Sequence, residues 1–306
     1  MNIIELISPL IFIAALGFSC AKSNWLSKDQ LNGISQLTFN VCIPAFLFSK
    51  MASAKLAQNI DLTFFLSFYL PVLICYVIAG LSNYFFHKQF NHNYQASAVF
   101  ALASSYSNTV IVGLPILFSL FGEQAMLLIF AIVTFHSALL FTITSAIAAK
   151  ENNKNWQSTL LSTFKNPLLM SIIGGALVNF FNIPFAEMLN QSLTLLGKPA
   201  ITLALFVLGA SLSYYPLKSE LKFVSISSVI KLLLLPFLVY VSAHYLFNLP
   251  PIQLTILVIL SACPTGVNAY LMAKNFRSHE ATVASTVVAT TLLSVISLSF
   301  WLWWLV

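Results

Sequence analysis

Long apolar stretches dominate the pattern of hydrophobic and polar positions along this 306-residue chain. Each is close to or above the ~20 apolar residues that an α-helix needs to cross a bilayer core of ~30 Å. They are continuously apolar, whereas the strands of a membrane barrel alternate in polarity over about ten residues. The pattern therefore predicts an all-α polytopic membrane protein with ten transmembrane helices: 3–21, 32–51, 62–86, 96–121, 125–149, 167–187, 191–214, 220–247, 252–273 and 281–305.

The composition supports the same class. Hydrophobic residues make up 59% of the chain, charged residues only 7%, and the mean hydropathy is +0.90. Because soluble proteins carry about 25% charged residues, this composition excludes a cytosolic enzyme, a disordered chain and a secreted disulfide scaffold. The four cysteines lie in apolar stretches without CxxC spacing, and we interpret them as small hydrophobic residues. No metal site and no cofactor is expected, and a bound sodium ion is left open.

The basic residues are distributed unevenly over the loops. Ten follow the odd-numbered stretches: Lys22, Lys28, Lys88, Lys150, Lys154, Lys165, Lys218, Lys222, Lys274 and Arg277. The loops after the even-numbered stretches and the two termini carry only Lys50 and Lys55. Because cytoplasmic loops are enriched in Lys and Arg, the odd loops are expected in the cytoplasm and both termini outside the cell membrane. The net charge of +6 therefore reflects topology, and no nucleic-acid partner is expected, since the basic residues never form a run.

An internal repeat relates the two halves of the chain. Four segments align at one offset of 158 residues: Ser8–Leu10 with Asn166–Leu168, Gly17 with Gly175, Ile43–Phe48 with Ile201–Phe206, and Tyr106–Asn108 with Pro264–Gly266. Five helices per copy is an odd number, so the second copy must be inverted in the membrane. We therefore expect two inverted five-helix repeats, at 1–149 and 167–306, joined by a cytoplasmic linker at 150–166.

The fourth and ninth stretches are interrupted near their middle by polar residues, glycine and proline, over Ser104–Pro115 and Ser261–Asn268. Proline removes a helical hydrogen bond, and polar groups at this depth are tolerated where they line a cavity. The pattern predicts broken, crossing helices 4 and 9, which is typical of the sites of secondary transporters. For helix 4, steric considerations place the break at Gly113–Pro115, whereas the repeat places it at Ser107–Asn108.

Broken helices direct half-helix N-termini and free backbone N–H groups at one place, which favours a negatively charged ligand. Side-chain amides in that region can bind a carboxylate or a sodium ion. The expected ligand is therefore a small organic anion. The candidate substrate-binding residues are those at the two breaks, with one from helix 2 and one from helix 8: Ser107, Asn108, Thr109, Pro264, Thr265, Gly266, Val267, Asn268, Asn40 and Lys231.

Few ionisable groups fall inside the apolar stretches. All eight acidic residues lie at predicted helix ends or in loops, which argues against a cationic substrate. Lys231 either faces a cavity, where it can neutralise an anion, or extends to the cytoplasmic surface. His136 either carries a proton or is a hydrogen-bonded packing residue. Lys198 lies between a glycine and a proline and either contributes to function or marks a helix end. His136 and Lys198 are the candidates for ion or proton coupling.

At these residues the sequence resembles the auxin efflux carrier family, which includes plant auxin exporters and bacterial members linked to malonate or other organic anions. The stretches Ser105–Pro115 and Cys263–Lys274 carry the resemblance, and Phe39–Pro44 and Lys231–Pro236 also fit. The likeness covers the whole chain. It implies an NhaA-like, elevator-type fold in which a transport domain moves against a scaffold domain.

The resemblance also implies roles for two residues, with Asn108 beside the first crossover and Pro264 at the second. The sequence departs from the plant pattern in two places. Ser107 stands where the plant proteins carry a proline, and helix 3, at 62–86, lacks the acidic residue that supports the crossover in the plant exporters. Auxin itself is therefore not expected as the substrate.

Together these features predict a secondary active transporter of a small organic anion, a mono- or dicarboxylate, that works by alternating access with sodium or proton coupling. Three alternatives stay open: an uncoupled uniporter, a channel-like facilitator and a sodium-coupled symporter of the bile-acid type. The scattered histidines and the lack of a nucleophile–base motif argue against an enzyme. The expected partners are the anion and the lipid bilayer, and a homodimer is left open.

Overall fold

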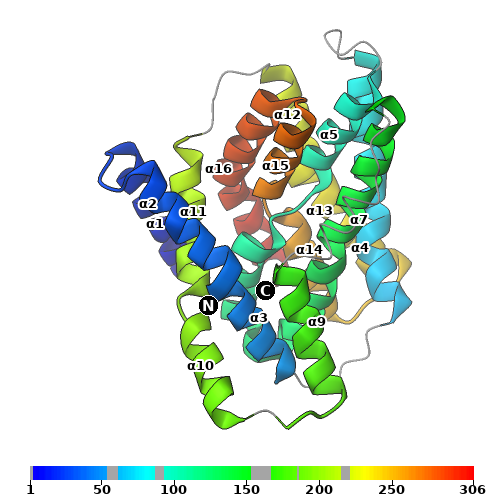
Figure 1. Ribbon diagram of the computed structural model, residues 1–306. Helices are drawn as coiled ribbons and strands as arrows, with labels where there is room; N and C mark the ends of the chain where they lie inside the picture. The colour runs from blue at the N-terminus through cyan, green and yellow to red at the C-terminus, as the bar shows by residue number, and fades with distance from the viewer. Residues whose placement is uncertain (1–2, 54–60, 87–92, 153–166, 185, 215–220) are drawn as a thin grey trace. The chain divides into compact units, whose positions relative to one another are not determined.

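The computed structural model describes residues 3–53, 61–86, 93–152, 167–184, 186–214 and 221–306. Over these residues the chain is almost entirely helical (Figure 1), and its one β-type pairing is the isolated bridge between Ser107 and Thr265. The helices form two compact units that we describe separately. The all-α class is confirmed for the described residues.

Unit 1 contains the helices α1, α2, α3, α6, α9, α10 and α11, together with the first part of α7. Their bounds are α1 Ile3–Lys22, α2 Lys28–Leu37, α3 Ile43–Ala52, α6 Leu114–Phe121, α7 Met126–Asn152, α9 Pro167–Phe180, α10 Glu187–Gly197 and α11 Ala200–Leu212. A π-helical turn, η1 (Thr38–Cys42), joins α2 to α3, and a 3-10 turn, η4 (Gly122–Ala125), precedes α7.

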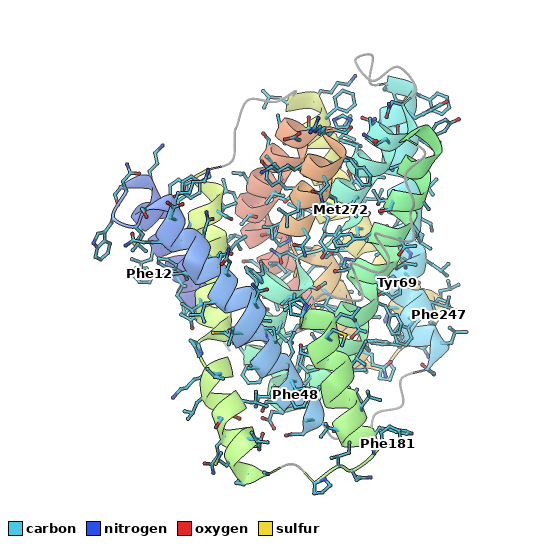
Figure 2. The ribbon with its side chains drawn as sticks, in the orientation of Figure 1. Phe12, Phe48, Tyr69, Phe181, Phe247 and Met272 are labelled. Carbon is cyan, nitrogen blue, oxygen red and sulfur yellow. The ribbon has the colours of Figure 1, made fainter. Side chains whose placement is uncertain are left out.

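Two helix pairs of unit 1 pack closely through glycines. In the pair α1 and α11, a Cβ added to Gly17 would lie 2.0 Å from the carbonyl oxygen of Phe206. In the pair α9 and α3, a Cβ added to Gly175 would lie 2.7 Å from the carbonyl oxygen of Phe48 (Figure 2 labels Phe48). Gly17 and Gly175 are 158 residues apart, and so are Phe48 and Phe206. The same glycine–carbonyl contact therefore occurs twice. In one copy the glycine comes from the first half of the chain, and in the other it comes from the second half.

Unit 2 contains α4, α5, α12, α13, α14, α15 and α16 and the second part of α7. The bounds are α4 Leu62–Phe86, α5 Tyr94–Ser105, α12 Leu221–Val229, α13 Leu235–Val241, α14 Pro251–Ala262, α15 Val267–Phe276 and α16 Glu280–Leu305. Three π-helical turns interrupt this part of the chain: η3 Thr109–Gly113, η5 Ile230–Leu234 and η6 Ser242–Leu246.

Within the described residues, six helical segments are long and apolar enough to cross a membrane: Lys28–Ala52, Leu62–Phe86, Met126–Ala148, Glu187–Leu212, Leu221–Leu246 and Glu280–Leu305. Four further apolar helices are shorter: Ser8–Lys22, Thr109–Phe121, Pro167–Phe180 and Pro251–Ala262. Large apolar side chains such as Phe12 and Phe181 are exposed (Figure 2), which suits a lipid environment. The chain is thus a multi-pass membrane protein.

The predicted helices at 96–121 and 252–273 are each divided by non-helical residues, as the prediction of two broken helices requires. The structure departs from the prediction at 167–187, where the helix ends at Phe180. The predicted linker at 150–166 lies largely outside the described residues. The two compact units do not coincide with the predicted repeats, because each unit takes helices from both halves of the chain.

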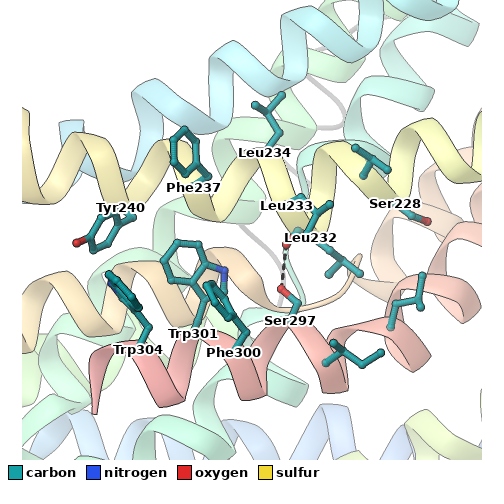
Figure 3. A pocket seen from close by; sticks show the side chains of 13 residues that line it. Ser228, Leu232, Leu233, Leu234, Phe237, Tyr240, Ser297, Phe300, Trp301 and Trp304 are labelled. Atoms are coloured by element: carbon teal, nitrogen blue, oxygen red, sulfur yellow. Dashed lines mark hydrogen bonds between the residues drawn. The ribbon is translucent and has the colours of Figure 1, made fainter.

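Unit 2 contains an apolar groove of about 980 Å³ between η5–α13 and α16 (Figure 3). Its lining includes Leu232, Phe237, Tyr240, Phe300, Trp301 and Trp304. The Ser297 hydroxyl donates a hydrogen bond of 2.9 Å to the Leu232 carbonyl there, so this polar side chain is satisfied inside the apolar lining.

Candidate functional site

The two helix breaks of unit 2 meet as a short antiparallel pairing. Helix α5 ends at Ser105 and α14 ends at Ala262, and the segments that follow pair at Ser107 and Thr265. The Asn108 N–H donates to the Pro264 carbonyl at 2.8 Å, and the Gly266 N–H donates to the Tyr106 carbonyl at 3.0 Å. These bonds satisfy backbone groups that the helix breaks would otherwise leave without partners. We call residues 106–108 and 264–266 the crossing.

The break in the predicted helix 4 therefore lies at residues 106–108, the position favoured by the repeat. Gly113 and Pro115, the steric alternative, lie in continuous helical structure. Proline is tolerated near the start of a helix, and Pro115 is the second residue of α6. The chain thus breaks where Asn108 and its neighbours gain partners across the crossing.

Each of the two segments of the crossing is hydrogen-bonded by a side chain of another helix. The Ser107 N–H donates to Nε2 of His136 in α7 at 2.9 Å, and the Thr265 N–H donates to Oγ1 of Thr290 in α16 at 3.0 Å. The Thr265 hydroxyl in turn donates to the Ala103 carbonyl at 2.8 Å. Because all five residues are buried, these bonds rigidify the backbone of the crossing.

Tyr106 connects the crossing to both α7 and α15. Its ring stacks on the His136 imidazole with a centroid separation of 5.0 Å and an interplanar angle of 9°. Its hydroxyl lies 2.7 Å from the Ser137 hydroxyl and accepts a hydrogen bond of 3.4 Å from the Asn268 amide. Sequence reasoning did not identify Tyr106 or Thr290 as site residues. Two signals pointed to Tyr106: the offset of 158 residues, which aligns it with Pro264, and its place in the stretch Ser105–Pro115.

Three buried hydrogen-bond donors at the crossing have no partner within the part of the chain that the structure describes: Ser107 Oγ, Asn108 Nδ2 and His136 Nδ1. We call these atoms the donor triad. The Asn108 amide oxygen accepts from the Ile111 N–H at 3.3 Å, so its NH2 group is the part left over. His136 Nε2 accepts the Ser107 N–H, so the proton of the neutral ring lies on Nδ1.

The donor triad is suited to a negatively charged ligand. Two of its three members carry N–H groups, which cannot coordinate a cation, and all three can donate to carboxylate oxygens. Helix α15 begins at Val267 after Gly266 without a side-chain cap, so the positive end of its dipole adds to the same preference. The sequence contains no acidic residue between Asp61 and Glu123 or between Glu220 and Glu280.

The Lys231 ammonium is fully buried in the π-helical turn η5 and donates a hydrogen bond of 2.6 Å to the Ser261 carbonyl in α14. The alternative that Lys231 extends to the cytoplasmic surface is therefore wrong. Its ammonium is held inside unit 2 because a backbone carbonyl there satisfies it.

The remaining predicted site residues divide between the two units. Thr109 is buried at the start of η3, and Val267 and Asn268 are half-buried in the first turn of α15, all within unit 2. Asn40 in η1 and Lys198 at the junction of α10 with α11 are exposed residues of unit 1. Among the described residues, no cluster of three or more His, Cys, Asp or Glu could hold a metal ion.

The chain is similar to known membrane transport proteins over nearly its whole length. Residues 2–302 match the family described as "Membrane transport protein". A protein of Rhizobium meliloti (strain 1021) with the name "Putative malonate transporter" is 21% identical over 301 residues, which cover 96% of this chain and 93% of that protein. The "Uncharacterized transporter YfdV" of Escherichia coli (strain K12) is 22% identical over 307 residues, covering 96% and 95%. The "Auxin efflux carrier component 8" of Arabidopsis thaliana is 21% identical over 345 residues, covering 94% and 93%.

Proposed function

The chain belongs to the auxin efflux carrier family of membrane transport proteins, and on that premise we propose that it is a secondary active transporter of a small organic anion. The family makes the chain a membrane transporter rather than an enzyme. We propose a mono- or dicarboxylate as the substrate and alternating access as the mechanism. Transport is driven by a sodium or proton gradient across the cell membrane.

The observation that carries the choice of an anion is the donor triad. A buried donor that lacks a partner costs ~1–3 kcal/mol, and a site with three of them is stabilised by a ligand that accepts hydrogen bonds. A carboxylate offers two acceptor oxygens and forms charge-assisted bonds, which are stronger than neutral ones. The name of the Rhizobium meliloti relative refers to malonate, a dicarboxylate, which agrees with this substrate class.

We further propose that the chain consists of two inverted five-helix repeats with ten transmembrane helices. Two features support this architecture. The glycine–carbonyl contacts of unit 1 recur at the offset of 158 residues, and so do the two backbone hydrogen bonds of the crossing. Within this scheme unit 2, which holds the crossing, is the transport domain, and unit 1 is the scaffold. Asn40 and Lys198 are then scaffold residues.

The placement in the membrane follows from charge. The ten basic residues of the odd-numbered loops support cytoplasmic odd loops and external termini in the cell membrane. The donor triad lies within one chain and binds an anion, so the proposal requires neither a homodimer nor a bound sodium ion.

The proposed function is tested by uptake of radiolabelled acetate, malonate and succinate into proteoliposomes that contain the purified protein. We expect saturable accumulation of at least one anion, and a requirement for a sodium or proton gradient. Uptake that only equilibrates would identify an uncoupled uniporter, and ionic conductance far above carrier turnover would identify a channel. If none of the three anions, nor taurocholate as a bile acid, were taken up saturably, the proposal would be wrong.

A matched pair of Asn→Asp variants tests the site. In Asn108→Asp, the carboxylate keeps the oxygen that accepts from Ile111 but replaces the NH2 donor with negative charge, so anion uptake should be abolished. In Asn93→Asp, the same change falls at the N-cap of α5, where the side chain accepts from the Ala96 N–H at 2.6 Å. Asp caps helices as well as Asn does, so uptake should be unchanged. Equal activity of both variants would remove Asn108 from the site.

A further inference from the structure

The crossing is nearly symmetric in its backbone hydrogen bonds. At the offset of 158 residues, Tyr106, Ser107 and Asn108 correspond to Pro264, Thr265 and Gly266. Two backbone hydrogen bonds are related by this correspondence. One runs from the Asn108 N–H to the Pro264 carbonyl, and its equivalent runs from the Gly266 N–H to the Tyr106 carbonyl. The two hydroxyl side chains at the centre, Ser107 and Thr265, therefore occupy equivalent positions.

The hydroxyl groups at these equivalent positions differ in their hydrogen bonds. The Thr265 hydroxyl donates to the carbonyl of Ala103, in the last turn of α5. The residue equivalent to Ala103 is Ser261, in the last turn of α14. Symmetry would therefore have the Ser107 hydroxyl donate to the Ser261 carbonyl. Ser107 Oγ instead lacks a partner among the residues that the structure describes, although the side chain is only 1% exposed.

Lys231 accounts for the difference. Its ammonium donates to the Ser261 carbonyl at 2.6 Å. A Ser107 hydroxyl that donated to the second lone pair of the same oxygen would bring its proton next to the ammonium charge, which disfavours that bond. The equivalent residue in the first half of the chain is Leu73, in α4, which has no donor to offer. The Ala103 carbonyl is accordingly left to Thr265. The asymmetry of the crossing thus comes from one lysine that only the second half contains.

We propose that Lys231 is a positioning residue, which occupies the Ser261 carbonyl and thereby keeps the Ser107 hydroxyl available to donate to a carboxylate substrate. Ser107 is then the substrate-contacting residue, and Lys231 acts through it. Removing the ammonium lets the Ser107 hydroxyl turn to the Ser261 carbonyl and form the bond that Thr265 forms on the other side. The site loses a donor although Ser107 itself is intact. This inference rests on the proposed transport of an organic anion.

The test is a double-mutant cycle on the KM of uptake into proteoliposomes, measured with whichever of acetate, malonate and succinate the wild type takes up fastest. Ser107→Ala should raise KM about tenfold, the effect of one hydrogen bond to a charged group. Lys231→Met should raise it similarly. In the Ser107→Ala background, Lys231→Met should change KM by less than about twofold, because its effect passes through the missing hydroxyl.

A control and an alternative variant complete the cycle. Ser105→Ala removes a buried hydroxyl that donates to the Ala101 carbonyl within α5, and its KM should equal that of the wild type. If Lys231→Met does not purify as a folded protein, Lys231→Gln replaces it, and the criterion is again whether its effect on KM persists without the Ser107 hydroxyl.

Two results would overturn the inference. One is a wild-type KM for Ser107→Ala. The other is that Lys231→Met raises KM by the same factor in the Ser107→Ala background as in the wild type. That result would mean that the ammonium attracts the anion directly. Either result leaves transport by the wild type intact, so the proposed function survives it. If the wild type takes up no carboxylate, the proposed function is wrong and this inference falls with it.

Discussion

The backbone N–H of Ser107 donates a hydrogen bond of 2.9 Å to Nε2 of His136. Because Nε2 accepts, the imidazole is neutral in this arrangement and carries its proton on Nδ1, the third member of the donor triad. Sequence analysis left two possibilities for His136, a group that carries a proton or a hydrogen-bonded packing residue. The geometry favours the second, because Nε2 accepts the Ser107 N–H and so holds the crossing.

His136→Leu should affect both stability and transport. The substitution leaves the buried Ser107 N–H without its acceptor, which costs ~1–3 kcal/mol of unfolding free energy, and it removes the Nδ1 donor. We expect a lower melting temperature of the detergent-solubilised protein and a KM for anion uptake raised about tenfold.

Thr290→Val is the matched control for His136→Leu. It removes the hydroxyl that accepts from the Thr265 N–H, with little change in side-chain shape, and it leaves the donor triad intact. The melting temperature should fall to a similar extent, whereas KM should stay near that of the wild type. Equal effects of the two variants on KM would contradict a role for His136 in binding the anion.

Gly266→Ala should destabilise the crossing. The backbone there has an ordinary φ of −69°, so the difficulty is space: an added Cβ would lie 2.4 Å from Cε1 of the Tyr106 ring, which is itself packed on His136. Overpacking of this kind costs ~1–3 kcal/mol. We expect a lower melting temperature and loss of uptake.

Gly33→Ala is the control for Gly266→Ala, because a Cβ on this exposed glycine of α2 meets no described atom within 4 Å. Alanine is the better helix former by ~0.5–1 kcal/mol, so this variant should melt at the same or a higher temperature. A stable and active Gly266→Ala protein would show that the ring of Tyr106 can move away.

The sequence was sufficient to predict the features that depend on local composition. The apolar stretch at 62–86 is the helix α4, and the interruptions in the stretches at 96–121 and 252–273 are real breaks. Where sterics and the repeat disagreed about the first break, the repeat was right. Partners across the crossing, 158 residues away in the sequence, decide where the backbone can leave the helix.

The pairing of side chains could not be predicted in the same way. Tertiary packing between helices decides these pairs. Lys231 binds the Ser261 carbonyl, and Tyr106 stacks on His136. A polar residue in an apolar stretch signals that a partner exists but not which one. Asn40 and Lys198 are exposed residues of unit 1, and their roles stay predictions.

The repeated glycine contacts of unit 1 predict that Gly17→Ala and Gly175→Ala both destabilise the protein. In each case the new Cβ would meet a backbone carbonyl of the partner helix, at 2.0 Å from Phe206 and 2.7 Å from Phe48, and a helix backbone cannot turn aside as a side chain can. We expect Gly17→Ala to lower the melting temperature more, since its contact is the shorter.

Gly80→Ala in α4 provides the comparison for these two variants. Its Cβ would lie 3.5 Å from that of Ala101, an ordinary contact distance, so the melting temperature should change little. If Gly17→Ala or Gly175→Ala behaved like Gly80→Ala, the close approach of the corresponding helix pair would be wrong, and with it the support that this pair gives to the repeat.

The proposed orientation in the membrane predicts that cysteines placed at Ser23 and Ser53 are labelled from opposite sides. Both residues are exposed and follow helices of unit 1, whereas the four native cysteines are buried. Ser23 lies beside Lys22 in the first basic loop, and Ser53 follows the second predicted span. In intact cells, a membrane-impermeant maleimide should label Ser53→Cys and not Ser23→Cys. Both should react once the cells are permeabilised, which controls for accessibility. The reverse pattern in intact cells would place the basic loops outside and refute the orientation inferred from charge.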